Sequence, residues 1–149
     1  MLRRVKLLKV NYTFRLLDPG FVATFKLVPV SNKLLALSFY PSGAVTYVPA
    51  SAKTKIFALS VFKPARKVLK GFDSSLTYSI IRFAPLFRKI SNIELFPGRG
   101  MQYARSAGCY GIITRCSTST HTAVVRLPSG VRKIFSVFSV LSLAPSALK

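Results

Sequence analysis

The alternation of apolar and polar positions predicts a β-hairpin in the last third of the chain. In Thr122–Leu127 every second residue is apolar, and Arg126 lies on the opposite face, as in a strand with one buried face. The turn residues Pro128–Gly130 separate this run from a second apolar run, Val131–Val137. Turn residues between two such runs indicate a hairpin.

The first third of the chain contains the same arrangement. The apolar run Lys33–Tyr40 is followed by a Pro-Ser-Gly turn, Pro41–Gly43, and then by Ala44–Ala50. Further strands are predicted at Phe21–Val30 and at Leu76–Phe83, and the basic segment Lys63–Gly71 between the hairpins is read as a loop or a short helix. The sequence therefore predicts an all-β protein.

The strands fall into two clusters, roughly Phe14–Phe96 and Arg99–Leu143. Several short strands with turn signals at short spacing are typical of small barrels. The segment Asn92–Gly100 would then be the junction between two such barrels.

The charge of the chain points to a polyanionic partner. The 149 residues include 23 Lys and Arg but only 3 Asp and Glu, a formal net charge of +20. This excess repels itself unless a polyanion screens it, and nucleic acid is the first candidate. Half of the residues are apolar, so an anionic membrane surface is the second candidate.

No apolar run reaches the roughly 18 residues that a membrane-spanning helix needs. The nearest, Ile134–Leu148, is interrupted by serines and a proline and is read as a strand followed by a tail. The basic, acid-free N-terminus Met1–Leu17 fits either a mitochondrial transit peptide or a basic strand of the mature protein, and the strand is preferred.

Residues for catalysis and metal binding are scarce. The acids are Asp18, Asp73 and Glu94, and His121 is the only histidine. General acid–base catalysis needs such groups side by side, and a structural zinc site needs four ligands. Two cysteines, at 109 and 116, are read as free thiols. We therefore expect no enzyme, no cofactor and no metal site.

Glycine and positive charge are concentrated in one stretch, Pro97–Gly111, which reads PGRGMQYARSAGCYG. Glycines allow unusual backbone angles and close approach to another surface. Arginines bind phosphate oxygens, polar groups bind sugars or base edges, and Tyr103 can stack on an unpaired base. This pattern indicates an RNA contact, and the alternative is a solvated loop with two incidental arginines.

This stretch also resembles a known family. The segment Asn92–Gly111, NIELFPGRGMQYARSAGCYG, is similar to the central signature of universal large-subunit ribosomal protein number two. The hairpin VVRLPSGVRKI, the strand pair ALSFYPSGAVTYVPA and the segment FRLLD (Phe14–Asp18) resemble further blocks of the family in the same order.

The resemblance implies an oligonucleotide-binding-type barrel over 1–96 and an SH3-like barrel over 97–149, both seated on large-subunit ribosomal RNA. The glycine-rich loop is a principal RNA contact in that family. The predicted RNA-contact residues are Arg15, Lys33, Gly98, Arg99, Gly100, Gln102, Tyr103, Arg105, Ser106, Gly108, Arg126, Arg132 and Lys133.

The chain also departs from the family. The N-terminal glycine-rich block and the C-terminal histidine-containing tail motif, which lies near the peptidyl transferase centre in the family, have no counterpart here. The sequence is therefore predicted to be the N-terminal fragment of a split protein in the matrix ribosome of a mitochondrion, less so of a chloroplast. A separate chain would supply the rest, and other ribosomal proteins would be neighbours.

The second barrel is accordingly expected to be incomplete, with Ile134, Val137 and Val140 lacking part of their cover. Two alternative functions remain open at this point. One is a basic module that binds an anionic membrane, and the other is a DNA-binding nucleoid protein.

Overall fold

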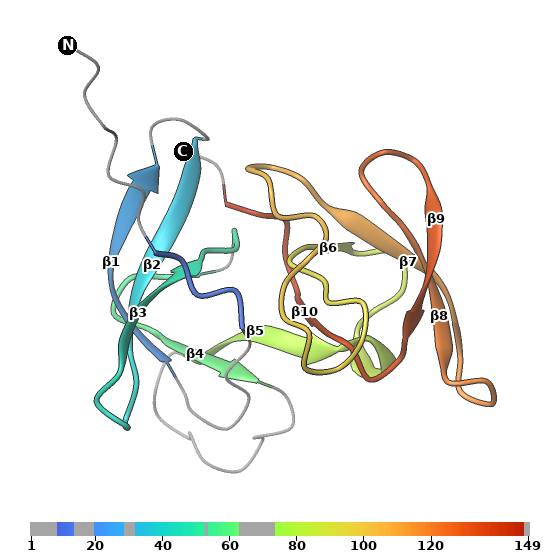
Figure 1. Ribbon diagram of the computed structural model, residues 1–149, viewed down its shortest axis with the longest axis horizontal. Coiled ribbons are helices and arrows are strands. Elements are labelled where there is room, and N and C mark those ends of the chain that lie inside the picture. Colours follow the sequence, from blue (N-terminus) through green and yellow to red (C-terminus); the bar gives the residue numbers. More distant parts are fainter. Residues whose placement is uncertain (1–8, 14–19, 29–31, 53, 63–73, 148–149) are drawn as a thin grey trace.

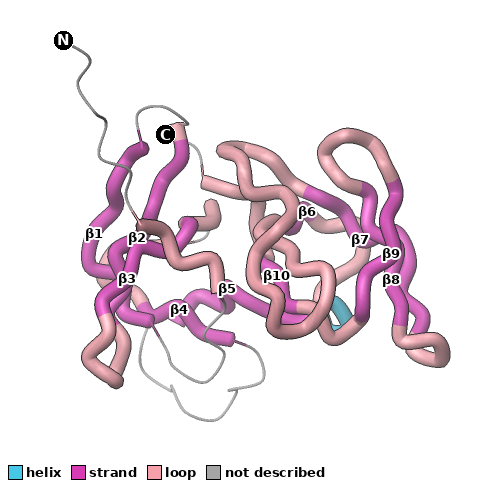
Figure 2. Tube along the Cα trace, viewed as in Figure 1, coloured by secondary structure: helices cyan, strands magenta, loops and turns pink. Residues whose placement is uncertain are grey.

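A computed structural model describes residues 9–13, 20–28, 32–52, 54–62 and 74–147. Within these ranges the chain is built from strands, with one short 3₁₀-helix (Figure 2). The predicted all-β fold class is therefore confirmed. The elements are β1 (Gly20–Val28), β2 (Lys33–Phe39), β3 (Val45–Pro49), β4 (Leu59–Phe62), β5 (Ser74–Ile80), η1 (Ile81–Phe83), β6 (Lys89–Ile90), β7 (Gly111–Ser117), β8 (Thr122–Arg126), β9 (Arg132–Ser136) and β10 (Val140–Ser142).

The first sheet has six strands in the order β10-β5-β4-β1-β2-β3. Strands β2 and β3 form the predicted hairpin, whose turn is closed by Gly43 N–H donating to the Tyr40 carbonyl at 2.9 Å. Gly43 has a φ of +84°, a left-handed angle that a glycine adopts without steric cost. Strands β4 and β5 pair in parallel, and every other pairing in this sheet is antiparallel.

The two outer strands of this sheet, β3 and β10, are followed by segments that hydrogen-bond to each other. Ala147 N–H donates to the Ala50 carbonyl at 3.1 Å, and Ala52 N–H donates to the Pro145 carbonyl at 2.9 Å. Because these bonds connect the chain beyond each outer strand, the six-stranded sheet curls toward a closed barrel.

The second sheet has four antiparallel strands in the order β6-β7-β8-β9. Strands β8 and β9 form the second predicted hairpin, with Arg126 opposite Arg132 and the Leu127 N–H donating to the Val131 carbonyl at 2.9 Å. The two sheets lie side by side, and β5 and β10 are the strands of the first sheet that lie next to the second (Figure 1).

Sheet membership does not follow the predicted division after residue 96. Strand β6 lies before that point and joins the four-stranded sheet, whereas β10 lies after it and joins the six-stranded sheet. The stretch Leu76–Phe83 was predicted as one strand, but β5 ends at Ile80 and η1 follows. The assignment of 1–96 and 97–149 as two domains stays a prediction, and the basic segment Lys63–Gly71 lies outside the described residues.

The core under the four-stranded sheet also corrects one expectation. Val137 and Val140 are 0% and 2% exposed, so this chain covers both, and only Ile134 is exposed, at 65%. The cover includes Ile81 of η1 and Leu141 of β10, which come from outside the four strands. The expectation failed because it left out β10, a three-residue strand whose partner is β5.

Candidate nucleic-acid interface

The glycine-rich loop is anchored by a buried carboxylate. Glu94 is 2% exposed. Its Oε2 accepts the N–H of Gly100 at 3.1 Å, and its Oε1 accepts the N–H of Val140 at 2.9 Å. Burial raises the pKa of the Glu94 carboxyl, while hydrogen bonds from the N–H groups of Val140, Gly100 and Gly98 act in the opposite direction. One side chain therefore ties the start of the loop to β10.

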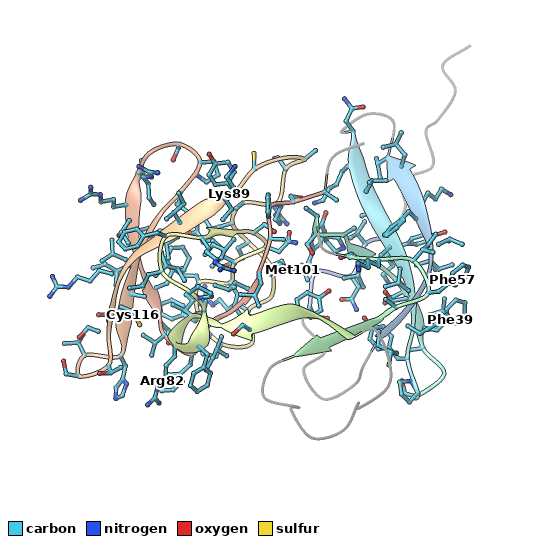
Figure 3. The ribbon with its side chains drawn as sticks, turned by 180° about the vertical axis from the view of Figure 1, so that it is seen from behind. Phe39, Phe57, Arg82, Lys89, Met101 and Cys116 are labelled. Atoms are coloured by element: carbon cyan, nitrogen blue, oxygen red, sulfur yellow. The ribbon has the colours of Figure 1, made fainter. Side chains whose placement is uncertain are left out.

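Gly100 is packed against the chain near the N-terminus. Its φ is +81°, and a Cβ placed on it would lie 2.9 Å from the Tyr12 carbonyl oxygen. The next residue, Met101, donates its N–H to the same oxygen at 2.8 Å and lies in the middle of the molecule (Figure 3). The close approach that Gly100 allows in this structure is therefore to this chain's own backbone, and its contact with RNA stays a prediction.

We expect Gly100→Ala to lower the free energy of unfolding by about 2–5 kcal/mol, because a left-handed alanine is strained and its Cβ overlaps a backbone oxygen. Gly98→Ala is the matched control, since Gly98 has a φ of +84° but nothing within 4 Å of the new Cβ. The control should lose only about 1–2 kcal/mol. Urea unfolding of both variants measures the difference. Equal losses of unfolding free energy would show that the close approach to Tyr12 does not affect stability.

The far half of the loop is tied to the C-terminal segment. The Gly108 N–H donates to the Ser146 carbonyl and the Ser146 N–H donates to the Cys109 carbonyl, both at 3.1 Å. The Ser146 hydroxyl donates to the Arg105 carbonyl at 3.3 Å. The backbone that carries Arg105 is therefore held by the fold, while the Arg105 side chain is exposed.

Two cations flank one aromatic ring at the foot of this loop. The Arg105 guanidinium carbon lies 4.8 Å from the centre of the Tyr12 ring, and the Lys33 Nζ lies 5.2 Å from it. Burial and then the charge of Arg105 lower the pKa of the Lys33 ammonium to about 8. Two predicted contact residues that are 72 positions apart in the sequence thus meet in space.

A band of cations crosses the four-stranded sheet. Lys89 pairs with Ile112, Ile112 with Arg126, and Arg126 with Arg132, along one row from β6 to β9. Residues that face one another in an antiparallel ladder project to the same face, and neighbouring strands lie about 4.8 Å apart. The three cations of this row are exposed, so they form a positive band across the sheet.

An open pocket of about 430 Å³ lies beside this band. Segments 108–112 and 126–130 supply its lining residues, among them Arg126 and Tyr110. The Lys89 Nζ lies 4.4 Å from the centre of the Tyr110 ring. The first cation of the row therefore contacts a residue that lines the pocket. Lys89 stands on the upper rim of this part of the molecule in Figure 3.

Tyr103 has partners within the protein. Its ring meets Phe135 edge to face at 5.3 Å between centroids, and the Lys133 Nζ lies 5.1 Å from the ring centre. The ring is half-buried against the core. In this structure the ring thus lies between Phe135 and Lys133, and its stacking on an unpaired base stays a prediction.

The remaining predicted residues lie at different places. Arg99 is exposed with its guanidinium 5.6 Å from the Phe96 ring, Gln102 and Ser106 are exposed, and Gly98 and Gly108 have φ angles of +84° and +73°. Arg15 lies outside the described residues. Sequence patterns did not reveal Tyr12 and Lys89 as parts of this surface, or Glu94 as the buried anchor beneath it. For Glu94 a signal existed, because an acid inside the signature of so basic a chain stands out.

Other kinds of site have little support in the described ranges. No group of three or more His, Cys, Asp or Glu residues is placed there to hold a metal ion. Cys109 and Cys116 are free, half-buried thiols. No helix among the described residues is long and apolar enough to cross a membrane.

The chain is similar in sequence to known proteins. No protein-family model matches the chain. The chain is 31% identical over 133 residues to the large ribosomal subunit protein uL2 of Azobacteroides pseudotrichonymphae genomovar. CFP2, covering 83% of this chain and 46% of that protein. It is 30% identical over 123 residues to uL2 of Wolbachia pipientis subsp. Culex pipiens (strain wPip), covering 80% of this chain and 42% of that protein. The chain thus spans less than half the length of each relative. Together, these likenesses support the uL2 family of large-subunit ribosomal proteins for this chain.

Proposed function

We propose that this chain is a structural, non-enzymatic constituent of the large ribosomal subunit that binds ribosomal RNA. The observation that carries the proposal is the glycine-rich loop, whose backbone is fixed by Glu94 and Ser146 while its arginines remain exposed. A fixed backbone with free cationic side chains suits the reading of a phosphate backbone. The similarity to uL2 proteins supports a ribosomal RNA as the partner.

The RNA surface in this proposal has two parts. The loop part comprises Arg99, Gln102, Arg105 and Ser106, which contact phosphates, sugars or base edges. The sheet part comprises Arg126 and Arg132 of the exposed row. Lys133 projects from the other face of β9, where its Nζ lies over the Tyr103 ring of the loop. Gly98 and Gly108 serve by giving the loop its left-handed turns. The proposed contact of Arg15 with RNA rests on the sequence resemblance alone.

The proposal also concerns the position of the chain within the ribosome and the kind of ribosome that contains it. Its place near the peptidyl transferase centre and its neighbours among ribosomal proteins rest on the family resemblance. A mitochondrial ribosome is proposed on the biased composition of the chain, which is rich in Phe, Leu and Ser and contains no Trp. The supply of the family's tail motif by a second polypeptide stays a prediction, and mass spectrometry of purified ribosomes tests it by searching for a fragment with that motif.

Sedimentation with RNA crosslinking tests the main proposal. The chain should sediment with the large ribosomal subunit and crosslink to its RNA through the loop peptide 97–111. Binding to anionic vesicles in the absence of RNA would favour the membrane alternative. Equal affinity for duplex DNA and ribosomal RNA would favour the nucleoid alternative.

We expect Arg105→Ala to weaken RNA binding roughly tenfold to 150-fold, because charge-assisted hydrogen bonds contribute about 1.5–3 kcal/mol each. Lys9→Ala is the control, since Lys9 is exposed and lies outside the loop and the sheet row. Fluorescence anisotropy measures the affinities, and thermal unfolding checks the fold. Equal effects of the two substitutions would mean that only total charge matters, and melting of Arg105→Ala would make its role structural.

A further inference from the structure

Lys33 is a buried cation at the start of β2. Its side chain is only 9% exposed, which is unusual for a lysine unless an anion pairs with it. No carboxylate does so among the described residues. The single acid there is Glu94, and both of its carboxylate oxygens accept backbone N–H groups, from Gly100 and Val140.

Arg105 brings a second positive charge to the same place. Lys33 and Arg105 both lie over the Tyr12 ring, with the ammonium at 5.2 Å and the guanidinium carbon at 4.8 Å from its centre. The ring attracts each cation, but the two cations repel each other, and the charge of Arg105 lowers the pKa of the Lys33 ammonium. A ring without net charge offsets this repulsion only in part, and no described residue adds an anion to the cluster.

The three side chains come from elements that the fold already holds together. The Tyr12 carbonyl accepts the Met101 N–H at 2.8 Å, and the Arg105 carbonyl accepts the Ser146 hydroxyl at 3.3 Å. Lys33 is fixed by its place in β2, opposite Val28 of β1. An anion entering here would therefore meet an ammonium and a guanidinium in place.

We propose that Lys33, Arg105 and Tyr12 form a binding site for a single phosphodiester group of an RNA backbone. The inference rests on the proposed function and names the chemistry of one contact within it. A guanidinium offers a planar fork to phosphate oxygens, and an ammonium adds a compact point charge. The bound phosphate supplies the charge that Lys33 otherwise lacks, and it lies where the glycine-rich loop meets the six-stranded sheet.

Proton uptake accompanies binding at this site. In the described structure Lys33 lies over the Tyr12 ring and feels the charge of Arg105, which stays protonated. Without RNA, Lys33 has a pKa of about 8, so it is charged at pH 7 and mostly neutral at pH 9. A phosphate favours the charged form and raises this pKa. Affinity is therefore steady below about pH 7 and falls above it, by about tenfold between pH 7 and pH 9.

The experiment measures the affinity of the full chain for a single-stranded RNA of adenosine and cytidine at pH 7 and pH 9. Fluorescence anisotropy at constant ionic strength gives the dissociation constants. Lys33→Met should bind roughly tenfold to 100-fold more weakly at pH 7 and should lose the pH dependence. Lys33→Arg should retain the affinity and also lose the pH dependence, since arginine stays charged.

Lys26→Met is the matched control. Lys26 is exposed and lies 5.9 Å from the Tyr47 ring, so it shares a lysine–tyrosine contact but not the burial or the second cation. This variant should keep both the affinity and the pH dependence of the parent chain within about threefold. Thermal unfolding of all variants confirms that each is folded before affinities are compared.

The outcomes separate the two levels of the proposal. RNA binding in which Lys33→Met and Lys26→Met behave alike overturns the phosphate site and leaves the proposed function standing. Failure to bind RNA, with binding to vesicles of anionic phospholipid instead, overturns both. A pH dependence that persists in Lys33→Arg assigns the proton to another group and also overturns the site.

Discussion

Raising the salt concentration from 50 to 200 mM is expected to weaken the binding of RNA by about 10³–10⁵-fold, if roughly 6–10 cations neutralise phosphates. The chain has a formal net charge of +20. The exposed cations of the loop and of the sheet row, with the Lys33 site, supply enough contacts in the described part alone. Each neutralised phosphate releases counterions, so the logarithm of affinity should fall linearly with the logarithm of salt concentration.

Substitution of single cations gives the control for this prediction. Arg126→Gln or Arg132→Gln removes one charge from the exposed row and should reduce the salt slope by about 0.7–0.9 each. Lys9→Gln, away from the proposed surface, should leave the slope unchanged. Titrations at four or five salt concentrations determine the slopes. A slope near zero for the parent chain would contradict phosphate neutralisation as the main source of affinity.

Glu94→Ala is expected to lower the free energy of unfolding by about 3–6 kcal/mol. The carboxylate accepts two buried N–H groups, those of Gly100 and Val140. Hydrogen bonds to charged groups contribute about 1.5–3 kcal/mol each. A domain of this size is stable by about 5–15 kcal/mol, so this loss is a large part of the total. Urea unfolding gives the loss, and hydrogen exchange should accelerate first at the amides of Gly100 and Val140.

Ser139→Ala is the matched control for Glu94→Ala. The Ser139 hydroxyl donates one neutral hydrogen bond to the Leu95 carbonyl at 2.9 Å, close to the same anchor. Its removal should cost only about 0.5–1.5 kcal/mol. Similar losses in the two variants would mean that the carboxylate does not organise the loop.

The pH dependence of stability gives a second measurement on Glu94. Burial raises the pKa of Glu94 in the folded state. At a pH between the unfolded and the folded pKa, Glu94 is therefore protonated in the folded chain and ionised in the unfolded chain. Stability should therefore fall as the pH rises from the unfolded pKa to the folded pKa, and it should level off above that. Glu94→Gln should remove this component of the profile.

Local patterns predicted the parts of the fold that depend on local interactions. Both Pro-Ser-Gly hairpins are present because turn residues and alternation are encoded in adjacent positions. Strands β4, β6 and β10 were missed because they have four, two and three residues, too few to show a period. Their place is decided by partners far away in the sequence, as β10 is by β5.

The same distinction applies to the candidate site. Lys33 and Arg105 were predicted separately, but their meeting over Tyr12 depends on the packing of the loop against residues 9–13, which no spacing reveals. Tyr103 was predicted as a stacking platform from residue type alone. Its contact with Phe135 pairs a loop residue with one of β9 and follows from tertiary packing.

The pairing of β10 with β5 sets an order of events during synthesis. Some 60 residues separate Val140 from its partner Ile80, and Ala147 bonds to Ala50 across a still longer interval. Contacts of such separation form slowly, because the loop that they close must first be ordered. The six-stranded sheet cannot reach its final arrangement until residues 140–147 have left the exit tunnel. Until then the nascent chain carries an open edge at β5 and unscreened positive charge, and it completes the six-stranded sheet and the loop anchor at Val140 in one step.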